Sequence, residues 1–241
     1  MQVITNTAII ESRSKWAKRV SPLAMLVLVG GFMLNLYSFD KPEYTQYTFI
    51  LLMIGFVLAI VSSHLVNRWV REPRADQVLT NTLKKFSKEF ILFNYTTSPP
   101  HILITPSRLY VIVVKRQSGQ ITVNGQRFSR KFSWIRLLRF FADEGLGAPG
   151  AEAENGISKL QKLLSTHLGE GEELPEVKAL IVFTDKNVEL VVNDPVMPVM
   201  RSNELKAYLR QQDKQHVIAG PLRNELVEII GGKFAADQER S

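Results

Sequence analysis

Residues 101–121 read HILITPSRLYVIVVKRQSGQI, and this stretch decides the fold of the chain. Two short apolar runs, at 101–105 and 108–115, are separated by Pro106-Ser107, which predicts two strands joined by a turn. The second run (LYVIVVK) is apolar at successive positions and therefore on both faces, which is typical of a central strand covered on both sides. We expect a third strand at 120–128, so that the three strands form an antiparallel meander.

The rest of the sequence after Pro73 also alternates between helical and strand patterns. Apolar residues recur at helical spacing from Arg74 to Phe93, which predicts an amphipathic helix before the strands. The further elements that we expect are helices at 133–142, 156–168, 203–212 and 222–230, strands paired with each other at 177–184 and 188–192, and an exposed loop at 144–155. This order predicts an α/β (α+β) domain at 76–241, in which helices cover a mixed sheet.

Two apolar segments fill much of the first 75 residues. Residues 20–39 and 47–66 each hold 20 residues without Asp, Glu, Lys or Arg, enough at about 1.5 Å per residue to cross a hydrocarbon layer of about 30 Å. The short segment between them leaves room only for a tight turn, which predicts a helical hairpin. A cleaved signal peptide is the alternative for the first segment, but that segment is longer than the usual ~7–15 apolar residues and no small-residue cleavage site ends it. We therefore interpret 1–75 as a membrane anchor of two transmembrane helices.

Basic residues flank both ends of the predicted hairpin. They are Arg13, Lys15, Lys18 and Arg19 before it, and Arg68, Arg71, Arg74, Lys84, Lys85 and Lys88 after it. Because Lys and Arg resist translocation, the N-terminus and the C-terminal domain are predicted to be cytoplasmic, in a multi-pass protein of the cell (inner) membrane. The lipid bilayer is the first partner that we expect.

The 241-residue composition excludes several kinds of chemistry. The chain has no cysteine, which rules out disulfides, thiol catalysis and zinc sites built on thiolates. No phosphate-loop, dinucleotide-binding or metalloprotease motif occurs.

Charge is strongly segregated along the predicted domain. From Phe90 to Ala142 there is no Asp or Glu, and the basic residues of this window are Arg108, Lys115, Arg116, Arg127, Arg130, Lys131, Arg136 and Arg139. Three interpretations remain open: a solvated helix rim, a contact with anionic lipid headgroups, and a nucleic-acid surface. The region 143–176 is acidic instead, and we interpret it as a solvated loop; the alternatives are that it faces the basic region or contacts another, basic protein.

The order of elements, together with His101, Thr105-Pro106, Lys115 and Ser118-Gly119, resembles the NERD (nuclease-related domain) family, a branch of the restriction-endonuclease-like PD-(D/E)XK fold. The resemblance covers roughly 76–212. It implies a Mg²⁺ site held by an Asp and a Glu, with a Lys two residues after the Glu that positions the attacking water. Lys115 matches that Lys, whereas Val113 stands in the place of the Glu and Pro100 in the place of the Asp. Neither Val113 nor Pro100 can bind a metal.

We therefore expect a degenerate site without catalytic or metal-binding residues or a cofactor, in a binding or scaffolding module at the inner face of the membrane. One alternative is a Mg²⁺-dependent DNA nuclease with relocated carboxylates, for which Glu89, Asp143 and Lys115 are the residues to test. The other is a structural component of a membrane complex that contacts another protein through its acidic region.

Overall fold

The structure is a computed structural model, and it describes residues 1–131, 145–168, 174–212, 218–232 and 234. The chain divides into two compact units. Thr7–Arg74 belong to one unit, and Met1–Asn6 join the described residues from Ala75 onward in the other. The helix predicted at 133–142 lies outside the described residues.

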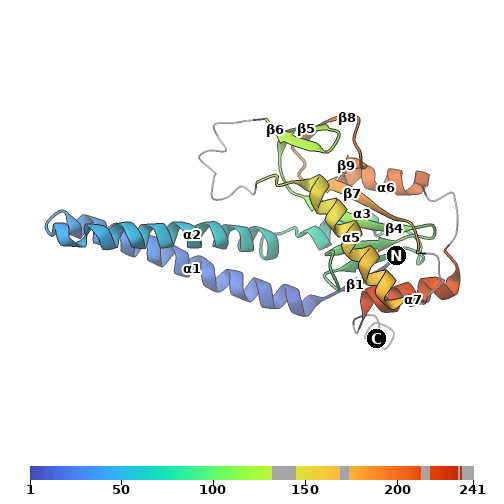
Figure 1. The fold of residues 1–241 in the computed structure, drawn as a ribbon, viewed down its shortest axis with the longest axis horizontal. Coiled ribbons are helices and arrows are strands. Elements are labelled where there is room, and N and C mark those ends of the chain that lie inside the picture. Colours follow the sequence, from blue (N-terminus) through green and yellow to red (C-terminus); the bar gives the residue numbers. More distant parts are fainter. Residues whose placement is uncertain (132–144, 169–173, 213–217, 233, 235–241) are drawn as a thin grey trace. The chain divides into compact units, whose positions relative to one another are not determined.

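The first unit is a pair of long helices, which Figure 1 shows side by side. Helix α1 (Thr7–Ser38) and helix α2 (Thr45–Trp69) are joined by a short 3₁₀ turn, η1 (Pro42–Tyr44). Both helices are long and apolar enough to cross a membrane, and their large apolar side chains are mostly exposed. The helical hairpin that the sequence predicted is thus present, and its composition suggests association with a membrane.

Buried residues at seven-residue spacing, most of them small, line α1 and α2. The buried positions are Ile10, Ala17, Ala24, Gly31 and Ser38 on α1, with Thr48, Gly55, Ser62 and Trp69 at the same spacing on α2. A Cβ atom on Gly31 would lie 2.9 Å from Leu52 Cδ2, and one on Gly55 would lie 2.8 Å from Leu28 Cδ2. The two glycines therefore allow the closest approach of the helices, as small residues do between membrane helices.

The second unit is built on a six-stranded mixed sheet in the order β1-β2-β3-β4-β7-β9. Its strands are β1 (Gln2–Thr5), β2 (Ile91–Asn94), β3 (His101–Ile104), β4 (Leu109–Lys115), β7 (Val177–Phe183) and β9 (Val199–Arg201). Strand β4 pairs antiparallel with β3 and parallel with β7. Residues 109–112 of β4 are at most 1% exposed, so the prediction of a central strand covered on both sides is confirmed.

Helices cover both faces of this sheet. On one face, α5 (Pro149–His167) and α7 (Gly220–Gly231) pack on alternate residues of β3 and β4, and Figure 1 shows α5 crossing the strands. On the other face, α3 (Ala75–Leu83) and α6 (Ser202–Gln212) enclose the second core. The mixed sheet between helices is the predicted fold class, and the predicted helices at 203–212 and 222–230 are confirmed by α6 and α7.

A separate three-stranded sheet, in the order β6-β5-β8, corrects two predictions. Its strands are β5 (Gly119–Asn124), β6 (Arg127–Arg130) and β8 (Val188–Asn193). The predicted strand at 120–128 is instead a hairpin that turns at Gly125-Gln126, where Gly125 has φ +58°. Glycine at the first of the two central residues is typical of the type II′ turn that joins two hairpin strands. The meander and the pairing of 177–184 with 188–192 were therefore wrong, because β5 pairs with β8 and β7 pairs with β4.

Two predicted boundaries were also wrong. The helix expected at 74–93 ends at Leu83, and Ile91–Asn94 form β2, since four consecutive buried residues fit a strand covered on both faces. The loop expected at 144–155 becomes helical at Pro149, the first residue of α5, because the fixed φ of proline suits the first helical turn. Strands β1 and β9 were not predicted.

Candidate functional site

The family's site positions lie together where β3 begins and β4 ends. Ile102 pairs with Val111, so extending this antiparallel register by two residues brings Pro100 opposite Val113. Val111, Val113 and Lys115 alternate along the same face of β4, the face covered by α5. The positions that the resemblance assigns to the two carboxylates are therefore occupied by Pro100 and Val113, which this register places opposite each other.

Lys115 is held by a carboxylate that the sequence analysis did not select. Its Nζ donates a hydrogen bond to Oε1 of Glu152 at 2.6 Å, in an ion pair. The Lys115 residue is 8% exposed, whereas the side chain of Glu152 is 49% exposed. Glu152 lies in the first turn of α5, where the helix dipole favours a negative charge. The signal that was missed is Pro149, which marks the start of this helix.

Backbone and amide groups enclose this pair, and we call Lys115, Gln117, Gly147 and Glu152 the Lys115 site. Gln117 is 3% exposed; its Nε2 donates to the carbonyl of Gly145 at 3.0 Å, and its Oε1 has no partner among the described residues. Gly147 has φ +65°, and a Cβ atom there would lie 3.0 Å from Glu152 Oε1 and 3.6 Å from Lys115 Nζ. The backbone at Gly147 therefore closes over the ion pair, and a side chain at this position would displace it.

Thr184 ties the ends of the two central strands together beside the Lys115 site. Its backbone N–H and its hydroxyl both donate to the carbonyl of Lys115, at 2.8 and 3.2 Å. From this point β5 and β8 leave the main sheet for the small one. The site is thus positioned at a fork between the two sheets.

The side chains of the Lys115 site do not fit the Mg²⁺ ion that the family implies. A hard cation needs several oxygen ligands, and the site offers one carboxylate, which already accepts from Lys115. In the part of the chain that the structure describes, no group of three or more His, Cys, Asp and Glu residues is arranged to hold a metal.

Glu89, the first carboxylate proposed for a relocated metal site, lies far from Lys115. Glu89 lies just before Ile91, the first residue of β2. Ile91 pairs with Ile104 of β3, and Ile104 pairs with Leu109, the first residue of β4. Lys115 is at the other end of this strand, about 20 Å away at ~3.3 Å per residue. The structure does not bring these two residues together, and Asp143 lies outside the described residues.

The basic residues predicted to contact lipid or nucleic acid are spread over the domain. Arg108 and Lys115 occupy opposite ends of β4, and Arg130 donates to the carbonyl of Ser118 at 2.7 Å. Arg127 and Lys131 are exposed, and Arg116 is partly exposed. Arg136 and Arg139 lie outside the described residues. The described members come from β4, β6 and the residues beside them, and their contact with lipid or nucleic acid stays a prediction.

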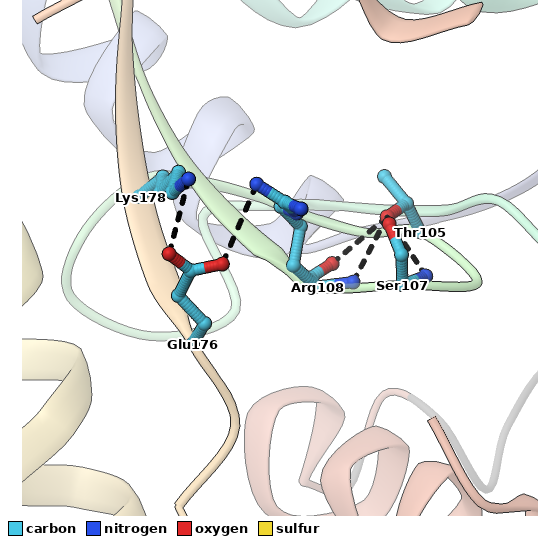
Figure 2. A network of polar contacts seen from close by, with 5 residues as sticks. All are labelled: Thr105, Ser107, Arg108, Glu176 and Lys178. Atoms are coloured by element: carbon cyan, nitrogen blue, oxygen red, sulfur yellow. Dashed lines mark hydrogen bonds and ion pairs between the residues drawn. The ribbon is translucent and has the colours of Figure 1, made fainter. Parts of the chain in front are cut away.

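Figure 2 shows how Arg108 is held at its end of β4. Its Nη1 lies 3.4 Å from Oε2 of Glu176, whose Oε1 lies 3.0 Å from Nζ of Lys178. The hydroxyl oxygen of Thr105 accepts from the backbone N–H groups of Ser107 and Arg108, which fixes the Thr-Pro turn that carried part of the family resemblance. Arg108 therefore stabilises the start of β4 and β7.

The acidic region predicted at 143–176 contacts the basic region within the domain. Glu152 pairs with Lys115 and Glu176 with Arg108, while Glu154 accepts a hydrogen bond from Gln126 at 2.7 Å. Glu152 and Glu176 thus pair with basic residues of the same domain, and a contact of this region with another protein stays a prediction.

Comparison with known proteins gives a family for part of the chain. Residues 65–184 match the family model of NERD, the nuclease-related domain. No curated protein and no solved structure matches the chain. The matched residues run from the end of α2 to Thr184 and include the whole of β4 and the Lys115 site. The chain therefore carries a nuclease-related (NERD) domain, preceded by two helices that are long and apolar enough to span a membrane.

Proposed function

We propose that this chain is a membrane-anchored NERD protein whose domain binds a partner at the inner face of the membrane without cleaving it. The observation that carries the proposal is the ion pair between Lys115 and Glu152. Lys115 is the member of the nuclease motif that the chain retains, and its amine is occupied by a carboxylate at 2.6 Å. Val113 and Pro100 have no side-chain oxygen that could hold a divalent cation beside Lys115.

The chemistry of two-carboxylate nucleases explains why these replacements matter. Such enzymes use metal-held oxygens to orient and activate the attacking water, and the lysine assists that water. Without the cation, a lysine paired to Glu152 has neither an activated nucleophile to assist nor a free amine. What remains is a folded domain with a buried cation at the fork between two sheets, which suits binding rather than hydrolysis.

The anchor supports the location of this module. Basic residues at both ends of the hairpin favour the arrangement in which the domain lies on the cytoplasmic side. The proposed partners are nucleic acid or anionic headgroups at the basic residues that stay exposed, Arg127 and Lys131 among them, or another protein at the acidic region.

The second candidate is a DNA nuclease with relocated carboxylates, and one observation favours it. Glu152 places a carboxylate from α5 directly beside Lys115, and the unpartnered Oε1 of Gln117 adds a second oxygen nearby in the chain. In this candidate, Glu152 and Gln117 supply the metal-binding oxygens instead of Glu89, which lies at the other end of β4.

A cleavage assay on the full chain in lipid nanodiscs separates the two candidates. Labelled DNA is incubated with Mg²⁺, with Mn²⁺ or with EDTA, and the chain is compared with Lys115→Ala, Glu152→Gln and, as a matched control, Lys159→Ala on the exposed face of α5. We expect no cleavage above the EDTA level in any sample. Metal-dependent cleavage that both site variants abolish and the control retains would overturn the proposal in favour of the relocated nuclease.

A further inference from the structure

Three basic side chains gather where the end of α3 meets α6, outside the Lys115 site. Lys206 and Arg210 are four residues apart on α6 and therefore lie on the same face of that helix. The guanidinium of Arg210 lies 5.9 Å from the centre of the Phe86 ring, and Phe86 directly follows Lys85 in the chain. We call Lys85, Lys206 and Arg210 the α6 cluster.

The packing of α3 against α6 fixes this arrangement. Leu79 and Leu83 of α3 and Leu205 and Leu209 of α6 are buried in the same core, at most 1% exposed. Phe86 packs against that core and lies 4.3 Å from the ring of Phe90. The cluster therefore stands on a rigid base rather than on a loop alone.

The three charges repel one another without a compensating acid. Loss of surrounding water lowers the pKa of Lys206 below its usual 10.5, and the charges of Arg210 and Lys85 lower it further. Among residues that the structure describes, no carboxylate forms an ion pair with any of the three; Glu204 on the same helix accepts instead from the backbone N–H of Arg201 at 2.9 Å. The cluster differs in this respect from Lys115 and Arg108, which are paired with carboxylates.

We propose that the α6 cluster binds the phosphate groups of anionic phospholipids in the bilayer that holds the hairpin. Lys85 and Arg210 are exposed, as are Lys84 and Lys88, which are close to Lys85 in the chain, so several cations face solvent. Flexible lysines suit a fluid array of phosphates, which presents no fixed geometry. Five residues separate the end of α2 from the start of α3, so the short tether keeps the cluster at a high effective concentration near the bilayer.

This inference rests on the membrane anchor and not on the absence of cleavage. A domain that cleaves DNA at the Lys115 site can still bind lipid through α6, so the two proposals fail independently. Nucleic acid is the other polyanion that the cluster would attract, and the experiment treats it as an outcome.

The full chain in nanodiscs allows a direct test because it contains no cysteine. Ser87→Cys, at an exposed position beside the cluster, is labelled with a fluorescent donor, and acceptor-labelled lipid headgroups report its distance from the bilayer. Ser165→Cys on the exposed face of α5 is the control label. We expect energy transfer from position 87 to rise when phosphatidylglycerol is added to phosphatidylcholine, and to fall at high salt.

Charge variants then assign the effect to the cluster. Each cation near an anionic surface changes the association constant by about fivefold, so neutralising all three to Gln lowers it on the order of 100-fold. The matched control neutralises Lys159, Lys162 and Lys186, which are exposed elsewhere on the domain. Circular dichroism checks that both triple variants are folded. If a triple variant does not fold, the corresponding single Gln variants are measured in its place.

The expected result is loss of the phosphatidylglycerol response in the cluster variant and its retention in the control. An equal response in both triple variants would overturn the proposal. A cluster variant that keeps the lipid response but loses binding of labelled DNA would also overturn it and assign the surface to nucleic acid.

Discussion

Gly156 sets the distance between α5 and the sheet, and replacing it with Ala tests how the Lys115 site is positioned. A Cβ atom at this position would lie 2.7 Å from Cγ1 of Val111 and 3.5 Å from Cβ of Pro99. Val111 is 1% exposed and β-branched, so its methyl group has little freedom to move away. The first turn of α5 carries Glu152, four residues earlier, and a shift of the helix would draw this carboxylate away from Lys115.

The magnitude follows from two opposing effects. An Ala in a helix is more favourable than a Gly by about 1 kcal/mol, while forcing an extra methyl group into a packed core costs about 1–3 kcal/mol. We expect a net loss of about 1 kcal/mol in the Gly156→Ala variant. In a Val111→Ala background the clash is removed, so the same substitution is expected to stabilise the domain by up to about 1 kcal/mol.

Hydrogen exchange of the β4 amides in the full chain, read by mass spectrometry, measures this free energy for the domain separately from the hairpin. Ser158→Ala, at an exposed position of α5, is the control and is expected to change stability by less than about 0.5 kcal/mol. The reasoning is refuted if Gly156→Ala stabilises the domain in the wild-type background, or if its cost is unchanged when Val111 is Ala.

Three further predictions concern the site, the hairpin and α6. Glu152→Ala leaves Lys115 buried without its carboxylate and is expected to cost about 1 kcal/mol by the same exchange assay, because Glu152 is half exposed; full stability in that variant would show that the ion pair contributes nothing. Gly55→Leu is expected to lower the thermal midpoint of the hairpin, followed by circular dichroism, whereas Gly30→Leu is expected to be silent because nothing lies within 4 Å of a Cβ there; equal effects would contradict the packing described. Burial raises the pKa of Tyr208 above its usual 10.0, so its contribution to stability is complete below pH 10 and is lost as the pH rises through the higher pKa of the folded state. Tyr208→Phe is expected to flatten the alkaline stability profile, and an unchanged profile would exclude Tyr208 as its cause.

The elements that were predicted correctly are those that depend on a local pattern of apolar residues. The apolar runs at 101–105 and 108–115 became β3 and β4, and the two apolar segments near the N-terminus became α1 and α2. In each case burial on both faces, or exposure to lipid, requires an uninterrupted apolar run. The resemblance that these strands carried also led to Lys115.

The elements and residues that were not predicted depend on contacts with residues distant in the sequence. Strand β1 has no strong pattern of its own and exists because it pairs with β2, 89 residues away at Thr5 and Asn94. Glu152 was missed because 144–155 is small, acidic and glycine-containing, a composition typical of a loop, although its second half is helical and Gly156 packs on Val111. Two local signals were available and overlooked: Pro149, which suits the first turn of a helix, and Gly125, which suits the first position of a two-residue hairpin turn.

The most direct test of the account is metal-dependent cleavage of labelled DNA by the full chain in nanodiscs, compared with Glu152→Gln and Lys115→Ala. The account predicts the same background in Mg²⁺, in Mn²⁺ and in EDTA for all three proteins. Cleavage by the unmodified chain that requires the metal and disappears in both variants would contradict it, and would make the ion pair of Lys115 and Glu152 part of a working nuclease.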